Sequence, residues 1–295
     1  MTGTLYLVGT PIGNLEDITD RARGTLGAVG LIAAEDTRRT GRLLAALGIR
    51  GRLVSFFAGN EAERIPELLG HLRDGTDVAV VSDAGMPGLS DPGYRLVAAC
   101  VEARIEVDVV PGPSAVVSAL VVSGLPTDRF VFEGFLPRAG RKRSGRIAQI
   151  AAEPRTIVLF ESPRRVASTL RALLDACGDR KIALVRELTK LHQEVLRGGL
   201  REVLQRIEAR DAVLGEVVIV LEGAPEEGPL ADIDVAVRNA REMAASGIRK
   251  REAARRASAS SGMPARTIYQ RLVEDQGTAA GSSRGAADRR AERSE

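Results

Sequence analysis

The sequence predicts an α/β protein with two successive sheets, followed by a small helical unit. Three observations lead to this prediction. Strand-like and helix-like segments alternate over residues 1–123, which is typical of a mainly parallel sheet covered by helices. In residues 124–224 several strand-like segments lie too close together for parallel crossover units, which indicates a mixed sheet. Residues 232–276 carry apolar positions at helical spacing.

In the first half, short runs rich in aliphatic and β-branched residues mark the strands. These runs cover residues 4–8, 29–34, 53–57, 77–81 and 105–110. Between them apolar residues recur at helical spacing, as in Ile18, Ala22 and Leu26. Parallel strands point their carboxyl ends to one edge, and most of these strands run into loops rich in Gly, Pro, Asp or Glu. We therefore expect a ligand site at that edge.

The second half starts again after a candidate linker at residues 123–129. Its expected strands cover residues 130–134, 156–160, 181–188, 193–197 and 216–222. A second linker is expected at residues 223–229, where Gly, Pro and Glu dominate. The helices of residues 232–276 resemble a helix-turn-helix, with Tyr269 and Val273 expected to face inward and Val235 on an apolar face. Residues 277–295 lack periodicity, so we expect a disordered tail.

One loop stands out as a ligand-binding candidate, SDAGMPGLSDPG at residues 82–93. It follows a buried strand and precedes a helix, and it is longer than most such connections. Its glycines allow the backbone to approach a ligand, its prolines stiffen it, and Asp83 and Asp91 supply carboxylates. The alternative is an ordinary surface loop.

Composition excludes several classes of protein. Apolar residues make up 44% and charged residues 27%, as in ordinary globular proteins. Aromatic residues are only 3%, so an extended base-stacking surface is poorly supplied. Neither of the two His nor the two Cys has partners at ligand spacing, so no metal site is expected. The net charge of +3 makes the location of the basic residues more informative than their excess.

We expect a cytoplasmic protein without a membrane contact. The start of the chain lacks the basic region of a signal peptide. Residues 109–127 carry no charge, but Pro111, Gly112, Pro113 and Gly124 interrupt them, which argues against a membrane span. A different segment, residues 137–146, holds five basic residues and no acidic one. It is either a solvated loop or an arm that contacts nucleic-acid phosphates.

The usual cofactor signatures are missing. The sequence holds no phosphate-binding G-x-x-x-x-G-K-[ST], no G-x-G-x-x-G after the first strand and no G-x-S-x-G. What remains is a cleft of Gly- and Pro-rich loops with scattered carboxylates. Such a cleft suits a compact cationic ligand held largely by backbone groups.

Six segments together carry a specific resemblance. They are VGTPIGNLEDIT (8–19), AEDTR (34–38), SDAGMPGLSDPG (82–93), VPGPSA (110–115), FESPRR (160–165) and RELTK (186–190). In this order they resemble the ribosomal RNA small-subunit methyltransferase I family, a branch of the tetrapyrrole-methylase-like enzymes. Each segment is weak alone, and the resemblance extends over residues 4–223.

The resemblance implies the two-domain tetrapyrrole-methylase-like architecture and a homodimer. It also implies methyl transfer from S-adenosylmethionine, without a metal, to the 2′-hydroxyl of a cytidine in the decoding region of small-subunit rRNA. The substrate is then the rRNA or the small ribosomal subunit. The cofactor-binding positions that it implies are Pro11, Ser82, Asp83, Ala84, Gly85, Pro87, Ser90, Ser114, Ala115, Phe160, Leu188 and Gly215.

A hydroxyl acceptor is a weak nucleophile, so a side chain should orient or deprotonate it. The acidic candidates within the motifs include Glu35, Asp36, Glu161 and Glu187, and we favour Glu35 and Glu187 as catalytic residues. Salt bridges at the strand ends are the competing interpretation. Two other functions stay open: carbon methylation of a tetrapyrrole by the same fold, and a non-enzymatic ribosome-assembly factor that binds RNA.

Overall fold

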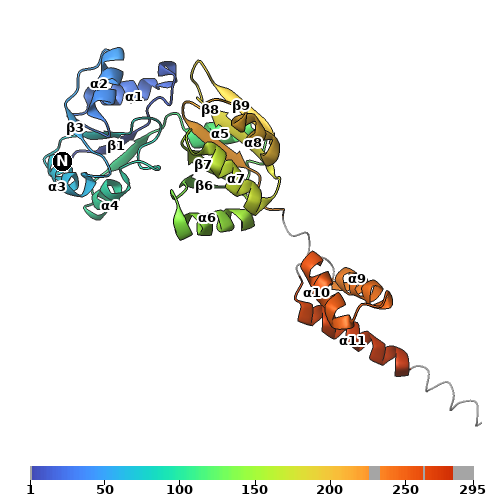
Figure 1. Ribbon diagram of the computed structural model, residues 1–295. Helices are drawn as coiled ribbons and strands as arrows, with labels where there is room; N and C mark the ends of the chain where they lie inside the picture. The colour runs from blue at the N-terminus through green and yellow to red at the C-terminus, as the bar shows by residue number, and fades with distance from the viewer. Residues whose placement is uncertain (1, 226–232, 262, 282–295) are drawn as a thin grey trace, which may run out of the picture. The chain divides into compact units, whose positions relative to one another are not determined.

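The computed structural model describes residues 2–225, 233–261 and 263–281, and it confirms the predicted class (Figure 1). The chain divides into two compact units, one of residues 1–224 and one that starts at Pro225. This division falls inside the linker expected at residues 223–229. The first unit holds two five-stranded sheets, and the second is helical.

The first sheet is entirely parallel, with strand order β3-β2-β4-β1-β5. Its strands are β1 (Leu5–Val8), β2 (Leu31–Ala34), β3 (Leu53–Ser55), β4 (Val78–Val81) and β5 (Val107–Val110). Strands β2 and β4 are buried at every position, as expected for strands covered on both faces. Because the connections between parallel strands return over the faces, all five carboxyl ends meet at one edge.

Helices cover both faces of this sheet. They are α1 (Asp20–Ala28), α2 (Thr37–Ala46), α3 (Glu61–Arg73) and α4 (Tyr94–Glu102), with a short 3-10 turn η1 (Leu15–Asp17) before α1. One core joins Leu68 of α3 and Leu96 of α4 to one face of the strands. The other joins Leu26 of α1 and Leu44 of α2 to the opposite face.

The second sheet is mixed, with order β6-β7-β10-β8-β9. Its strands are β6 (Phe130–Phe135), β7 (Thr156–Glu161), β8 (Lys181–Arg186), β9 (Glu194–Gly199) and β10 (Val217–Leu221). Only β6 and β7 run parallel; β10 is antiparallel to β7 and β8, and β9 is antiparallel to β8. The prediction of a mixed second sheet is therefore confirmed.

Helix α5 (Ala115–Ser123) connects the two sheets in an order that the sequence did not suggest. Its buried residues Val116, Ala119 and Leu120 pack against Val158 and Val220 of the second sheet. The chain therefore passes from one sheet to the other at residues 111–114, and residues 124–129 join α5 to β6. The domain boundary at residue 123 stays a prediction, since residues 1–224 form one compact unit.

The other face of the second sheet carries α6 (Gly140–Ala152), α7 (Val166–Cys177) and α8 (Leu200–Glu208). Helices α6 and α8 were not predicted from the sequence. The loop interpretation of residues 137–146 is wrong, because most of this segment forms the first turns of α6. Its apolar anchors, Ile147 and Ile150, follow the basic run, so the run alone shows no helical periodicity.

The second unit consists of α9 (Ile233–Ala245), α10 (Lys250–Ser261) and α11 (Ala265–Gly281). Ile268 and Leu272 are buried in its core, as expected, but Tyr269 and Val273 are exposed, which corrects their predicted inward orientation. Val235, one of the apolar positions expected on α9, is exposed as well. The reason is that Ala residues of α9 and α10 fill much of this small core. Helix α11 runs past residue 276, and the rest of the expected tail, residues 282–295, lies outside the described residues. No helix in the described ranges has the length and apolar character of a membrane span.

The loops after β1 and β5 approach each other through two glycines. A Cβ atom on Gly9 would lie 2.7 Å from the Cα atom of Gly112 and 2.7 Å from the sulfur of Met86. The amide of Gly9 also donates to the carbonyl of Val110, at 3.0 Å. These contacts fix the loop after β1 against the residues that lead into α5, so they set the edge at which the sheets meet.

We therefore expect Gly9→Ala to lower the free energy of unfolding by about 1–3 kcal/mol, because the added methyl group overlaps with backbone. Gly24→Ala is the matched control, since Gly24 lies in α1 and nothing would lie within 4 Å of its Cβ atom. It should stabilise the protein by about 0.5–1 kcal/mol through helix propensity. Urea denaturation followed by circular dichroism measures both changes. Equal midpoints for the two variants would contradict the steric argument.

Candidate functional site

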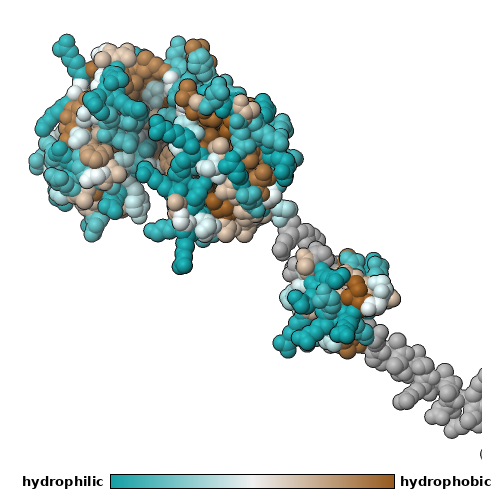
Figure 2. Space-filling view, in the orientation of Figure 1, coloured by the Kyte–Doolittle hydropathy of each residue, from teal (hydrophilic) through white to brown (hydrophobic). Residues whose placement is uncertain are grey.

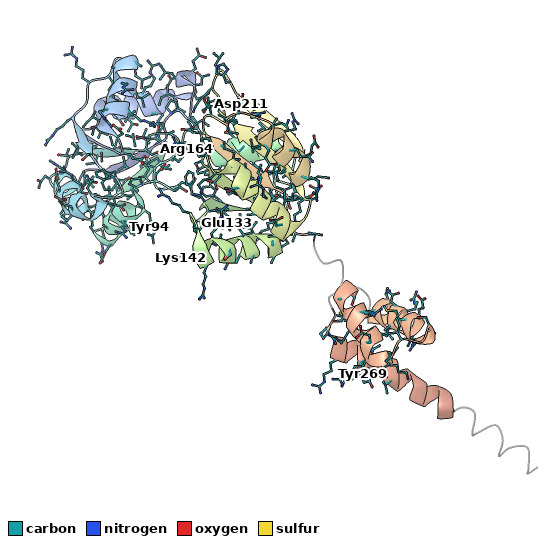
Figure 3. The ribbon with its side chains drawn as sticks, in the orientation of Figure 1. Tyr94, Glu133, Lys142, Arg164, Asp211 and Tyr269 are labelled. Atoms are coloured by element: carbon teal, nitrogen blue, oxygen red, sulfur yellow. The ribbon has the colours of Figure 1, made fainter. Side chains whose placement is uncertain are left out.

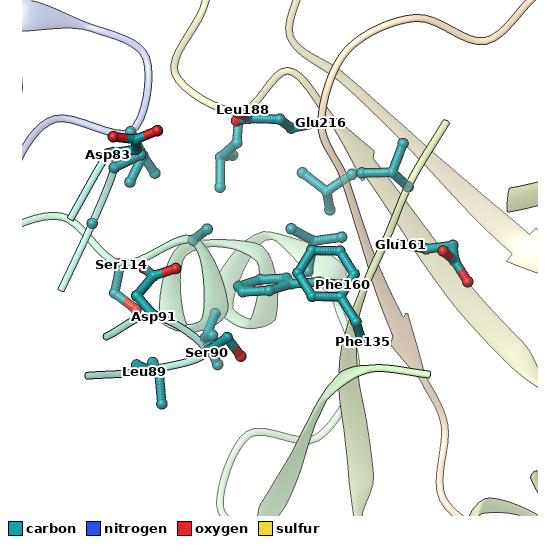
Figure 4. Close-up of a pocket in the computed structure, with 18 of the residues that line it drawn as sticks. Asp83, Leu89, Ser90, Asp91, Ser114, Phe135, Phe160, Glu161, Leu188 and Glu216 are labelled. Atoms are coloured by element: carbon teal, nitrogen blue, oxygen red, sulfur yellow. The ribbon is translucent and has the colours of Figure 1, made fainter. Parts of the chain in front are cut away.

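A cavity of about 400 Å³ lies between loops of the first sheet and the surface of the second. Residues from the ends of β2, β4 and β5 line one part, and residues of β6, β7, β8, β10 and their loops line the other. Figure 4 shows Asp83, Asp91 and Ser114 on one side and the rings of Phe135 and Phe160 on another. The size suits a small organic ligand.

The loop of residues 82–93 is held in place by the loop after β1. The amide of Thr10 donates to the carbonyl of Gly85 at 2.9 Å, and the amide of Gly85 donates back at 3.0 Å. The Thr10 hydroxyl donates to the carbonyl of Ser82 at 3.2 Å. Gly85 has a φ of +79°, a conformation that favours glycine at this position. The cavity wall is therefore a backbone structure shared by two strand ends.

Carboxyl groups from β2 and β4 form an interlocked wall. The amide of Asp83 donates to Glu35 Oε2 at 3.0 Å, and the amide of Asp36 donates to Asp83 Oδ1 at 3.1 Å. Arg39 Nη1 lies 3.1 Å from Asp83 Oδ2. Glu35, Arg39 and Asp83 all line the cavity. Each loop thus fixes the carboxylate of the other, and one guanidinium offsets part of the charge.

Asp91 is a further carboxyl group at this wall, and it lines the cavity. Burial, together with the negative charges of Glu35 and Asp83, raises the pKa of Asp91 to about 6, although a hydrogen bond with Ser82 opposes this shift. The preceding residue, Ser90, has a φ of +68°, which is uncommon for a residue with a side chain. A carboxyl group that titrates near neutral pH in a cavity is a candidate functional group.

The opposite wall is apolar and aromatic. Phe160 packs edge-on against Phe132, with ring centres 4.9 Å apart, and tilted against Phe135, with ring centres 5.5 Å apart. Phe160 is partly buried, whereas the side chain of Phe135 lies at the outer part of this wall and 58% of the residue is exposed. The cavity thus has one charged side and one apolar side.

Glu187 does not belong to the lining of the cavity, although Leu188, Gly215 and Glu216 do. Its Oε1 atom accepts from the amide of Glu216 at 2.9 Å and from Lys190 Nζ at 2.9 Å. The amide of Glu216 and then the Lys190 ammonium lower the pKa of Glu187. A Cβ atom on Gly215 would lie 2.3 Å from this carboxylate, so the glycine lets the turn close over it. These contacts suit a carboxylate that shapes the turn carrying Gly215.

Glu161 lines the cavity but is fully committed to internal contacts. Thr169 Oγ1 donates to its Oε2 atom at 2.6 Å, and the amide of Ser162 donates to Oε1 at 2.8 Å. Arg165 Nε lies 3.4 Å from Oε1, and Arg143 Nη2 donates to Thr169 at 2.9 Å. This network ties α6 and α7 to the end of β7.

Most of the residues predicted for the site come together in this cavity. The lining includes Glu35, Asp83, Ala84, Gly85, Ser90, Ser114, Ala115, Phe160, Leu188 and Gly215. The predicted residues outside the lining are Pro11, Ser82, Pro87 and Glu187. Pro11 and Ser82 directly precede lining residues, and Pro87 and Ser82 are buried in the loop.

Arg39 and Phe135 were not expected at the site, and Asp91 was expected only as a carboxylate of the loop, without a role of its own. Asp91 lies within the loop motif, but the sequence does not show that the folded chain places it near the carboxylates of Glu35 and Asp83. Phe135 follows Gly134, where the pairing of β6 with β7 shifts register, and such a bulge leaves little trace in a sequence. Within the described part of the chain no group of three His, Cys, Asp or Glu side chains could hold a metal ion.

Comparisons with known proteins identify sequences that are related to this chain. Residues 4–204 match the family model of the tetrapyrrole (corrin/porphyrin) methylases. A protein of Thermotoga maritima named ribosomal RNA small subunit methyltransferase I is 54% identical over 75% of this chain and 99% of its own length. A protein of the same name from Mycobacterium tuberculosis is 46% identical over 92% of this chain and 95% of its own length.

The fold also resembles solved structures. A cobalt precorrin-4 methyltransferase, a cobalamin biosynthetic enzyme, superposes with a TM-score of 0.56 over 74% of this chain and 94% of that chain, at 16% identity. At this identity the likeness shows the fold alone. The matches in sequence carry the assignment: the chain is a methyltransferase that belongs to the tetrapyrrole (corrin/porphyrin) methylase family and, within it, to the ribosomal RNA small subunit methyltransferase I group.

Proposed function

We propose that the protein transfers a methyl group from S-adenosylmethionine to the 2′-hydroxyl of a cytidine in the decoding region of small-subunit rRNA. The observation that carries this proposal is the 54% identity to a Thermotoga maritima protein that is named a methyltransferase of this RNA. The match covers 99% of the length of that protein and 75% of this chain. The cavity adds a chemical argument, because it offers a cationic ligand a wall of carboxylates. The small ribosomal subunit or its rRNA is the substrate, the cytoplasm is the compartment, and the working form is a homodimer.

The residues of the cavity fit S-adenosylmethionine. This co-substrate carries a positively charged sulfur, and when bound it supplies an electrophilic methyl group. Asp83, Asp91 and Glu35 place negative charge in a partly buried wall, where a cation interacts more strongly than in water. Phe160 and Leu188 provide apolar surface for the adenosine part. The loop backbone at Ala84 and Gly85, with Ser114 and Ala115 at the start of α5, completes the proposed binding set.

Transfer to a hydroxyl needs a group that takes its proton. As the ribose oxygen bonds to the methyl carbon and the carbon–sulfur bond breaks, the hydroxyl proton must leave. Asp91 lines the cavity and has a pKa of about 6, so at pH 7 it is largely ionised and still basic. We assign the proton-accepting role to Asp91. Glu35, favoured from the sequence, orients the Asp83 amide, and Glu187 holds the turn of Gly215 and Glu216.

The two alternative functions differ from the proposed one in the substrate that is methylated or in whether the cofactor binds. A tetrapyrrole methyltransferase would methylate carbon of a porphyrinogen and ignore rRNA. A non-enzymatic assembly factor would bind RNA with a strong salt dependence and would not bind the cofactor.

The direct test is mass spectrometry of small-subunit rRNA from a strain in which the gene is deleted. We expect loss of one 2′-O-methylcytidine in the decoding region, and its return when the gene is restored. Restoration with Asp91→Asn should return far less methylation. Unchanged ribose methylation in the deletion strain would contradict the proposed function, and methyl transfer to a porphyrinogen would favour the first alternative.

The charge on Asp91 should make cofactor affinity depend on pH. A bound cation favours the ionised carboxyl, so affinity should rise as pH increases through about 6 and then level off. One additional charge interaction predicts about tenfold between pH 5 and pH 7.5. Isothermal titration calorimetry with S-adenosylmethionine measures this change.

Asp91→Asn should flatten the pH profile of cofactor affinity. Asp36→Asn is the control, since Arg38 holds the pKa of Asp36 at about 2, so its charge does not change over this range. Asn also keeps the N-cap that Asp36 provides for α2. An Asp91→Asn variant with the wild-type profile would show that another group causes the pH dependence.

A further inference from the structure

Phe135 combines three properties that the proposed cofactor site does not use. It lines the cavity, it belongs to an aromatic pair with Phe160, and 58% of the residue is exposed. Phe160, by contrast, is only partly exposed and has rings on two sides. The chain has only six Phe and no Trp, so an exposed aromatic ring in the cavity lining is unusual for it. Such a ring is a candidate contact for a second ligand.

The backbone is built to hold the ring there. The pairing of β6 with β7 shifts register between Phe132 and Gly134, and Gly134 has a φ of +60°. Bulges of this kind redirect side chains beside active sites. A Cβ atom on Gly134 would lie 3.2 Å from the hydroxyl oxygen of Ser90, so the bulge touches the loop that carries Asp91. Ser90, with its positive φ, is therefore in contact with the bulge at Gly134, which directly precedes Phe135 in the chain.

The residues after Phe135 are fixed as well. Arg165 Nη2 donates to the carbonyls of Leu136 and Pro137, at 3.0 and 3.2 Å, and Arg143 Nη1 donates to Pro137 at 3.3 Å. Both arginines belong to the network around Glu161. These hydrogen bonds fix the backbone that follows Phe135. A fixed backbone reduces the entropy cost of binding a flat ligand against the Phe135 ring.

Basic residues follow the lining residues Phe135 and Pro163 along the chain. Arg138, Arg141 and Lys142 are exposed beside the start of α6, and Arg164 is exposed directly after the lining residue Pro163. Among the described residues none of these four has an ion pair with a carboxylate, and Lys142 extends away from the body (Figure 3). Figure 2 shows hydrophilic side chains gathered around the start of α6. Such cations suit the phosphates of a polynucleotide.

We propose that the acceptor base stacks on Phe135 while its ribose reaches the carboxyl of Asp91. The inference rests on the proposed function and identifies the surface that receives the RNA. Single-stranded nucleotides are commonly held by stacking on an aromatic side chain, with cations on the flanking phosphates. The cavity is then divided by charge: carboxylates face the sulfonium, and the ring with its neighbouring cations faces the nucleotide. The cofactor adenine lies against Phe160, the inner ring.

The test compares Phe135→Leu with Phe135→Tyr in the full-length protein, using small ribosomal subunits from a deletion strain and labelled S-adenosylmethionine. Loss of the ring should lower kcat/KM for the subunit by about ten- to a hundredfold, mainly through a higher KM, because a stacked base contributes that much affinity. Phe135→Tyr keeps a flat ring and should stay close to the wild type. Tyr94→Leu is the matched control, since Tyr94 is 75% exposed on α4, outside the cavity lining.

Calorimetry with S-adenosylmethionine and sedimentation analysis complete the design. The proposal predicts unchanged cofactor affinity and an unchanged oligomeric state for Phe135→Leu. Wild-type kcat/KM in this variant would overturn it. A selective loss of cofactor affinity would place the ring at the adenine instead, and dissociation into monomers would place it in a contact between copies, so either result also overturns it. Absence of rRNA methylation by the wild type would instead refute the proposed function.

Discussion

The site depends on the partial burial of three neighbouring carboxyl groups, Glu35, Asp83 and Asp91, at the carboxyl edge of the first sheet. Charges of one sign cannot be brought together away from water without compensation. Here backbone amides and Arg39 compensate part of the charge. The pKa of Asp91 is still raised, first by its burial and then by the negative charges of Glu35 and Asp83. The wall is therefore prepared for a ligand that brings positive charge, which is the property that distinguishes a sulfonium from most cofactors.

The fold supplies this wall by joining backbone to backbone. The ladder between Thr10 and Gly85 and the close approach of Gly9 to Gly112 lock the strand-end loops together. Helix α5 then leaves this edge and packs on the second sheet, so its first residues lie in the cavity while its apolar face belongs to the other core. One helix thereby positions an aromatic wall from the second half opposite an acidic wall from the first. Methyl transfer between two bound molecules needs that kind of fixed alignment.

Much of the fold could be predicted because local patterns decide it. Every strand of both sheets was expected close to its observed place, and the loop of residues 82–93 was recognised from its glycines, prolines and carboxylates. Helix α6 was missed because its buried isoleucines follow a basic run. Packing of α5 on the second sheet depends on tertiary contacts, which spacing does not encode. In the site, Glu187 was favoured as a catalytic residue, but its carboxylate accepts from Lys190, three residues along the chain, and from the backbone amide of the distant Glu216. The raised pKa of Asp91 and the position of Phe135 at the cavity depend on residues of other strands and loops, which are distant in the sequence.

We propose that this acid-lined cavity receives the methyl donor with its positive charge toward the carboxylates. A crystal structure of the protein with S-adenosylmethionine would reveal where the sulfonium binds. We expect the sulfonium to lie in the cavity, with Asp83 and Asp91 as the nearest charged side chains and the methyl group directed to the side of Phe135. A cofactor bound at another surface, or bound here with its sulfur remote from both carboxylates, would show that the carboxylates do not bind the sulfonium.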